Sequence, residues 1–245
     1  MISFLLTLTA LLALLFAVSG LLSARGSKAG ARLMWAGWLG ALALLVGNAL
    51  LAGAPPFGSM RHVLCFFPLA LVPGWYYLRR VKKVELGAYF AWAAVVALIG
   101  ALCMPMQAGW RQMPALQSPW FVPHVTSYVL SYGLLTVSAL LALLGGEERL
   151  LRADAVVRLA FPFMTFGLWS GALWADAAWG RYWAWDIKEV WSLITWLVYL
   201  IYFHSCAYLP TWRRGLLLVG FAAVVITFLV VNLLPKISSL HSYAM

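Results

Sequence analysis

The chain has 245 residues, of which 64% are hydrophobic and 10% are charged, and its mean hydropathy is +0.91. A soluble domain has about 25% charged residues, so this composition excludes an ordinary soluble fold and indicates one polytopic membrane domain, residues 1–245. The net charge of +10 comes from Lys and Arg in short loops between apolar runs, which does not indicate nucleic-acid binding.

Apolar runs of about 20 residues recur along the chain, and each is long enough to cross about 30 Å of hydrocarbon. In chain order they predict eight transmembrane helices, over residues 2–22, 33–53, 61–78, 86–104, 121–144, 155–177, 190–209 and 216–234. Positive charges follow the first run instead of preceding it, so this run is predicted to be a retained helix and not a signal peptide. The predicted fold class is therefore all-α.

Basic residues in the loops predict the orientation of these helices. Loops 23–32, 79–85, 145–158 and 210–215 together carry twelve Lys and Arg residues, whereas the opposite side carries five. Because basic loops stay on the cytoplasmic side, both termini are predicted to lie outside. The Trp-rich loop between the sixth and seventh helices is predicted on the same periplasmic or equivalent face.

The cysteines Cys65, Cys103 and Cys206 form neither a CxxC nor a CxxCH pattern. No structural disulfide, zinc site or covalent attachment site for c-type haem is therefore predicted.

A Trp-rich loop is predicted at about residues 174–192 and contains the string WGRYWAWDIKEVWS, residues 179–192. Asp186 followed by Glu189 resembles a capping pair that opens the seventh helix at about Ile187. One interpretation of the tryptophans is an interfacial aromatic belt. The alternative is a flat apolar surface for a flat ligand, and haem fits because its propionates can pair with Arg181 or Lys188.

The chain has four histidines, and imidazole is a common axial ligand of haem iron. His124 and His241 are predicted on the same face as the Trp-rich loop, where two imidazoles could hold one iron. His62 is predicted at the outer mouth of the third helix, and His204 lies about 25 Å deep in the seventh helix. The alternative is that His124 and His241 are ordinary polar residues at the membrane interface, and that His204 makes a hydrogen bond between helices.

The string WGRYWAWDIKEVWSLITWLVYLIYFH closely resembles the Trp-rich "WWD" signature of the CcsA/ResC family, the haem-handling proteins of system II cytochrome c biogenesis. The resemblance extends to PALQSPWFVPHVTSYVLSYG before this string and NLLPKISSLHSYAM after it, and PPFGSM resembles the family's early outer loop. It is dense over about residues 114–245 and thinner before them.

The resemblance implies that the chain moves haem b across a bacterial or plastid-type inner membrane and presents it to apocytochrome c, whose CxxCH thiols add to the haem vinyls. It implies that His124 and His241 are axial ligands of an outer haem iron and that His204 is a ligand of an inner haem iron. The other implied haem-binding residues are Trp179, Arg181, Tyr182, Trp183, Trp185, Asp186 and Trp191.

The resemblance also implies partners. The second ligand opposite His204 would come from a CcsB/ResB-like membrane protein, since this chain has no second histidine at that depth. Holocytochrome c synthase activity, or haem lyase activity, would require that partner, and no residue is expected to be catalytic beyond positioning haem. A thiol-reducing thioredoxin-like protein is a further expected partner. His62 stands where many relatives have Glu.

Two other functions stay open. A CcmC-type or Nrf-type protein shares the Trp motif and loads haem onto a chaperone or a specialised cytochrome, although CcmC usually has fewer spans. A respiratory subunit with haem b would place paired histidines on two helices at matched depths, and this chain has no such pair.

Overall fold

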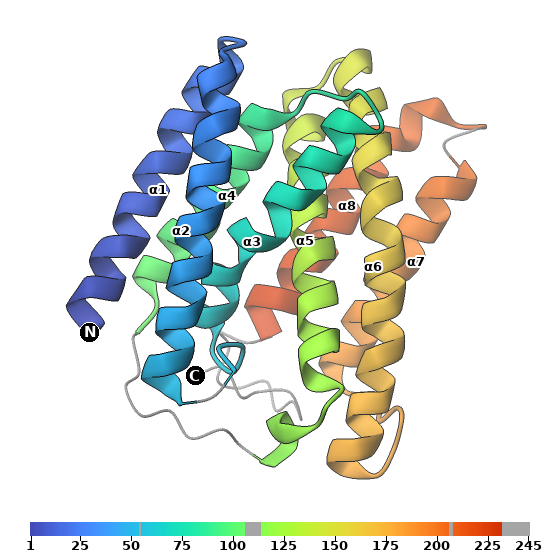
Figure 1. Ribbon diagram of the computed structural model, residues 1–245. Helices are drawn as coiled ribbons and strands as arrows, with labels where there is room; N and C mark the ends of the chain where they lie inside the picture. The colour runs from blue at the N-terminus through green and yellow to red at the C-terminus, as the bar shows by residue number, and fades with distance from the viewer. Residues whose placement is uncertain (54, 106–113, 206–207, 232–245) are drawn as a thin grey trace. The chain divides into compact units, whose positions relative to one another are not determined.

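The computed structural model describes residues 1–53, 55–105, 114–205 and 208–231. These residues form helices and turns with no strand among them, which confirms the predicted all-α class (Figure 1). Contacts divide the chain into two compact units, residues 1–113 and 114–245. That the units act as one membrane domain stays a prediction.

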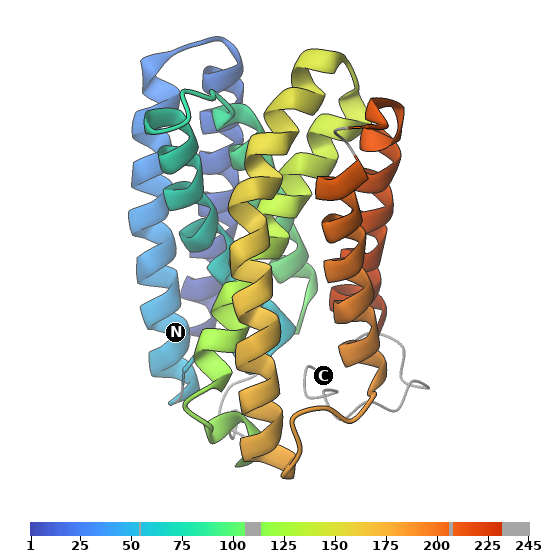
Figure 2. The same cartoon turned by 90° about the vertical axis from the view of Figure 1, so that its right-hand side faces the viewer.

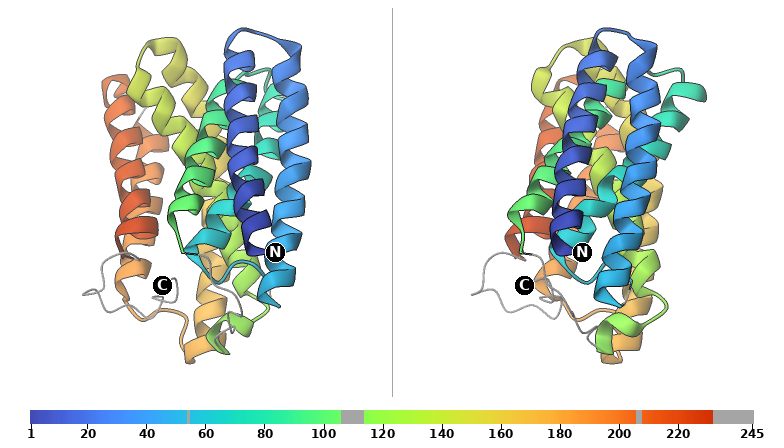
Figure 3. Two further views of the ribbon diagram at one scale, coloured as in Figure 1. Left: turned by 90° about the vertical axis from the view of Figure 1, so that its left-hand side faces the viewer. Right: turned by 60° about the vertical axis from the view of Figure 1, so that its left-hand side comes forward.

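The first unit contains four helices in series: α1 Ile2–Ala24, α2 Lys28–Ala52, α3 Met60–Arg80 and α4 Gly87–Cys103. Helix α1 packs against both α2 and α4, and α3 packs against the same two helices (Figure 3). Gly37 lets α1 and α2 approach closely, because a Cβ atom there would lie 2.7 Å from Cζ of Phe16. Phe16 is fully buried, so this close approach is part of the core of the first unit.

Capping residues set the ends of the helices in the first unit. The hydroxyl of Ser27 accepts a hydrogen bond from the backbone N–H of Ala29 at the start of α2. The hydroxyl of Ser59 accepts one from His62 at the start of α3. Helix α2 ends at Gly53, whose φ of 65° lies in the left-handed region that favours glycine.

In the second unit a 3₁₀ turn, η1 Pro114–Gln117, leads into the long helices α5 Phe121–Leu144 and α6 Glu147–Trp179. Helix α7 Ile187–Ser205 follows, and then the turn η2 Pro210–Trp212, helix α8 Arg213–Val225 and a π-helical turn, η3 Ile226–Val230. Helices α5 and α6 form the most extensive helix pair, and α8 packs against both α5 and α7 (Figure 2).

The described residues contain eight α-helices, and each corresponds to one predicted span. Among the helix starts the largest difference is at α6, which was predicted over 155–177 and begins at Glu147. The charged residues that suggested a loop pair one turn apart on this helix, Glu148 with Arg152 and Asp154 with Arg158. Such pairs support a helix that continues past the apolar stretch.

Several of these helices are suited to crossing a membrane. Among the described residues, five segments are long and apolar enough: Ile2–Ala24, Lys28–Ala52, Phe121–Leu144, Glu147–Trp179 and Pro210–Val230. Helix α4 is apolar but shorter. The chain is therefore a multi-pass membrane protein, whereas the side on which each loop lies stays a prediction.

Candidate functional site

The Trp-rich segment begins inside one helix and ends inside the next. Helix α6 continues through Trp179 and ends at Gly180, whose φ of 72° is left-handed. The non-helical part is therefore residues 180–186, a shorter stretch than the predicted 174–192. Figure 2 shows this loop at the end of the second unit that also holds the start of α5.

Asp186 and Glu189 fix the start of α7. Oδ2 of Asp186 accepts a hydrogen bond from the backbone N–H of Lys188 at 3.2 Å. Oε2 of Glu189 accepts from the N–H groups of Asp186 at 3.1 Å and Ala184 at 2.8 Å. The predicted capping pair and the helix start at Ile187 are thus confirmed. Because Ala184 lies two residues before Asp186, Glu189 also holds the loop itself.

The loop turns aromatic rings outward. Trp185 is 73% exposed and Tyr182 is 58% exposed, beside the exposed Arg181. Trp185 has a φ of 58°, in the left-handed region that bulky residues rarely adopt. Trp183 packs edge to face on Trp185 with ring centroids 5.9 Å apart. Its buried indole nitrogen has no hydrogen-bond partner within the described part of the chain.

His124 lies in the first turn of α5 and is oriented by α6. Its Nδ1 atom lies 2.9 Å from the carbonyl oxygen of Gly167. A carbonyl can only accept, so this contact favours the tautomer with the proton on Nδ1 and the lone pair on Nε2. The imidazole also stacks on Trp174, with centroids 5.3 Å apart and planes 26° apart. These contacts therefore set the plane of the ring and favour a proton on Nδ1.

Trp174 joins His124 to the Trp-rich segment. Its Nε1 atom donates a hydrogen bond of 2.7 Å to the carbonyl of Ala115 in η1. Its ring packs edge to face on Trp179, with centroids 5.0 Å apart. His124, Trp174 and Trp179 thus form a continuous aromatic row that leads to the loop, and we call it the His124 row.

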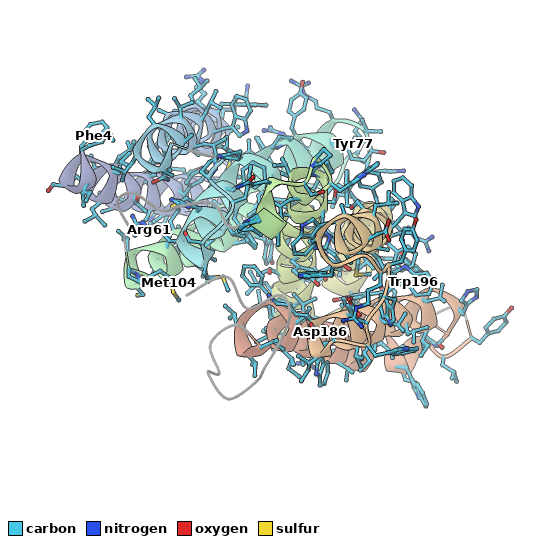
Figure 4. All side chains as sticks on the ribbon, turned by 90° about the horizontal axis from the view of Figure 1, so that it is seen from below. Phe4, Arg61, Tyr77, Met104, Asp186 and Trp196 are labelled. Carbon is cyan, nitrogen blue, oxygen red and sulfur yellow. The ribbon has the colours of Figure 1, made fainter. Side chains whose placement is uncertain are left out.

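The remaining predicted site residues are less closely connected to this row. Trp191 is half-buried in α7. Asp186 is labelled in Figure 4, which views the protein from below. His204 is exposed next to Ser205, the last residue of α7, and so lies at the opposite end of that helix from the loop. His241 lies outside the described residues, so its pairing with His124 stays a prediction.

The donor chemistry of the site is one oriented imidazole beside several indole rings. Indole surfaces stack on flat aromatic ligands, and imidazole Nε2 is a metal ligand when Nδ1 is hydrogen-bonded. The exposed Arg181 adds a cation at the same loop. These are groups of the types that bind a planar macrocycle with a central metal and an acidic edge.

Comparison with known proteins adds an independent observation. Residues 2–239 match the family model described as cytochrome C assembly protein. The chain belongs to that family.

Relatives of this cytochrome c assembly protein include three proteins named cytochrome c biogenesis protein CcsA. The one from Porphyra purpurea is 30% identical over 306 aligned positions, covering 93% of this chain and 95% of that protein. The one from Trieres chinensis is 29% identical and covers 84% of this chain and 86% of that protein. The one from Chlamydomonas reinhardtii is 39% identical, covering 56% of this chain and 44% of that protein.

These matches confirm the resemblance to the CcsA family that the Trp-rich string carries. This cytochrome c assembly protein is therefore a multi-pass membrane protein of cytochrome c biogenesis.

Sequence reasoning missed several residues that shape the site of this cytochrome c assembly protein. Trp174 lies where the predicted sixth span and the predicted Trp-rich loop overlap, and nothing in the sequence indicates that it packs on His124. Gly171 makes room for His124, since a Cβ atom there would lie 2.6 Å from both Cε1 and Nδ1 of the imidazole. Gly167 supplies the carbonyl that orients the same ring. The glycines recur four residues apart, which places both on one face of α6, but the sequence does not indicate what packs there.

Proposed function

We propose that this protein is the haem-handling membrane subunit of a cytochrome c synthase. It receives haem b as a substrate, holds it beside the Trp-rich loop on the outer face, and presents it to the CxxCH segment of apocytochrome c. The observation that carries the proposal is the orientation of His124 by Gly167 and Trp174 at one end of the His124 row.

The loop supports binding of the macrocycle. Trp185 and Tyr182 are exposed on a segment whose backbone Glu189 ties to α7, so their rings are presented on a fixed support. Exposed aromatic rings on a fixed support lose little conformational entropy when a flat ligand stacks on them. Arg181 is available at the same loop for a propionate.

The chemistry of attachment is supplied mainly by the reactants. Each cysteine thiol adds across a haem vinyl group: the sulfur forms a bond to one vinyl carbon and the proton ends on the other, with no net change in redox state. The task of this chain is to hold one imidazole on the iron and the indole surface against the ring. Holding reactants in register lowers a barrier by about 7–11 kcal/mol, so no strong acid or base is needed.

Partner proteins complete the proposal. His241 is proposed as the second outer ligand, and the histidine of the incoming CxxCH segment would replace one of the two imidazoles. His204 is exposed at the far end of α7, which suits a ligand that shares its metal with a CcsB/ResB-like partner. The CcsA names of the relatives favour this function over haem loading of a chaperone and over a respiratory subunit.

The test is the absorption spectrum of the purified protein and of four variants, each with one histidine changed to alanine. We expect wild type to carry substoichiometric b-type haem with a low-spin spectrum from two imidazole ligands. His124→Ala and His241→Ala should each lose the outer haem signal, and free imidazole should restore it. His62→Ala is the matched control and should keep the signal. Full spectra and full cytochrome c assembly in both His124→Ala and His241→Ala would contradict the ligand assignment.

A further inference from the structure

Tyr128 lies one turn after His124 on α5 and joins this helix to both α6 and α7. Its ring packs edge to face on the imidazole of His124, with centroids 5.1 Å apart and planes 82° apart. The same ring lies against α6, because a Cβ atom at Gly167 would be 2.9 Å from Cδ2 of Tyr128. Its hydroxyl is hydrogen-bonded to the side chain of Ser192 on α7. Tyr128 therefore contacts the imidazole, the glycine whose carbonyl orients that imidazole, and the helix that follows the Trp-rich loop.

The direction of the hydrogen bond between Tyr128 and Ser192 follows from the other contact of the serine. Oγ of Ser192 donates to the carbonyl oxygen of Glu189 at 2.7 Å. A serine hydroxyl has one proton and two lone pairs, so with its proton used it can only accept from the phenol. Glu189 in turn holds the N–H groups of Ala184 and Asp186 through its carboxylate. A short path through one serine and one glutamate therefore leads from the phenol into the loop.

Helix α7 packs mainly on a helix that does not orient His124. It lies chiefly against α8 and much less against α6. Two side-chain hydrogen bonds tie it to α6 farther along the helix. Nε1 of Trp196 donates to Oγ1 of Thr165 at 3.0 Å, and the hydroxyl of Tyr202 donates to Oδ1 of Asp154 at 3.2 Å. The contact at Ser192 is closer to the loop than either, so it is well placed to connect the loop with α5.

We propose that Tyr128 is a positioning residue that couples the shape of the Trp-rich loop to the position of the His124 imidazole. This inference rests on the proposed function, in which haem meets the loop and the imidazole together. When haem stacks on the exposed rings of the loop, Ser192 holds the phenol in place, and the ring of Tyr128 limits the movement of the imidazole. An ordered loop then favours an ordered ligand, and the reverse also holds, because coupling between two parts of a site is reciprocal.

The first experiment needs no haem. Hydrogen exchange at the amides of loop 180–186 is measured by mass spectrometry on the purified full-length protein. Tyr128→Phe removes one oxygen and keeps the ring against His124. Exchange should become about fivefold faster, which corresponds to the loss of one buried hydrogen bond. Ser192→Ala should have the same effect, and the double variant should exchange no faster than either single variant, because both changes remove the same hydrogen bond.

Tyr132→Phe is the matched control. Tyr132 lies one turn farther along α5, and its hydroxyl is hydrogen-bonded to Thr227 in η3 instead of to α7. The variant removes the same atom from the same helix, so loop exchange should match wild type. Equal rates in Tyr128→Phe and wild type, or equally faster exchange in both tyrosine variants, would overturn the coupling.

The second experiment adds haem and reports on the imidazole. Haem is titrated into wild type, Tyr128→Phe and Tyr132→Phe, and electron paramagnetic resonance spectra of the ferric complexes are compared. Tyr128→Phe should bind haem about fivefold more weakly than wild type. Its low-spin signals should be broader with changed g values, because these values depend on the orientation of an axial imidazole. Tyr132→Phe should match wild type in both measurements.

The outcomes separate this inference from the proposed function. If wild type binds haem through His124, and Tyr128→Phe has the affinity and spectrum of wild type, the coupling is overturned and the haem site stands. If wild type binds no haem, or if His124→Ala binds haem as wild type does, the proposed function fails. The exchange experiment then still decides whether Tyr128 links the loop to α5.

Discussion

The hydrogen bond and the stacked ring that orient His124 come from the neighbouring helix. Gly167 offers a carbonyl to Nδ1, Gly171 leaves room for the ring, and Trp174 stacks on it, all from α6. The imidazole is therefore sensitive to substitutions that never touch the histidine itself.

Gly171→Ala tests this sensitivity. The new methyl group would lie 2.6 Å from two atoms of the His124 ring, so the ring has to move away from the Gly167 carbonyl. We expect affinity for added haem to fall at least about tenfold. The higher helix propensity of Ala, about 1 kcal/mol, should offset part of the cost of moving the ring, so the protein should stay folded. The measurements are a haem titration and thermal unfolding followed by circular dichroism.

The control for Gly171→Ala is Gly215→Ala in α8, where an added Cβ would meet nothing within 4 Å. That variant should bind haem like wild type. Unchanged haem affinity in Gly171→Ala would show that the position of the His124 ring does not matter for binding.

Residue identity alone predicted part of this site. The capping pair Asp186 and Glu189 was predicted from an acid three residues after a cap. His124 was singled out by its predicted place on the same face as the Trp-rich loop and by the family resemblance, and its role as a haem ligand stays a prediction. Trp174 was not readable, since its role depends on which helix faces it. The same holds for Arg61, which the sequence offers only as one loop charge and the structure buries against α4.

At the scale of helices, the start of α7 and the loop before it form one hydrogen-bonded element. Glu189 accepts two backbone N–H groups, from Ala184 and Asp186, through a single oxygen atom. Its other oxygen, Oε1, is buried and has no partner within the described residues. Helix start and loop shape should therefore change together when this side chain is altered.

Glu189→Ala should loosen the loop without unfolding the second unit. Removing the acceptor leaves two N–H groups without partners, at a cost of about 1–2 kcal/mol. We expect faster hydrogen exchange at the amides of Ala184 and Asp186, measured by mass spectrometry of peptides that cover the loop. Glu189→Gln keeps an acceptor oxygen and should change less. Glu148→Ala removes an exposed carboxylate from α6 and is the control, and loop exchange as slow as in wild type for Glu189→Ala would refute this role.

The positions of the helices were predicted well because the length of each apolar run determines them. The start of α6 is an exception with a physical cause. Helix α6 extends beyond its apolar stretch through charge pairs one turn apart, Glu148 with Arg152 and Asp154 with Arg158. An apolar window cannot detect that extension. The loop is shorter than predicted, residues 180–186 instead of about 174–192. Its Trp-rich flanks belong to α6 and α7, because tryptophan does not by itself end a helix.

At the scale of the whole molecule, the charge of the loops predicts an orientation in the membrane that can be tested directly. Twelve basic residues lie in the loops predicted inside and five on the predicted outer side. This bias predicts that loop 180–186 faces outward and that loop 81–86 faces the cytoplasm.

Cysteine labelling in intact cells checks the orientation. In a background with Cys65, Cys103 and Cys206 replaced by serine, Tyr182→Cys should react with a membrane-impermeant maleimide. Lys82→Cys should react only after the cells are opened. Both positions are exposed, so reactivity reports the side of the membrane and not burial. The reverse pattern would place the Trp-rich loop in the cytoplasm and rule out presentation of haem on the outer face.

The unusual backbone at Trp185 has a practical consequence for anyone who would engineer this protein to resist heat. A left-handed conformation costs a residue with a side chain about 1–2 kcal/mol, and glycine would remove that cost. A screen that rewards thermal resistance alone would therefore tend to discard the indole at position 185. The most exposed ring of the loop is the one that such a screen is least able to keep, so thermal resistance and the proposed binding of haem have to be selected together.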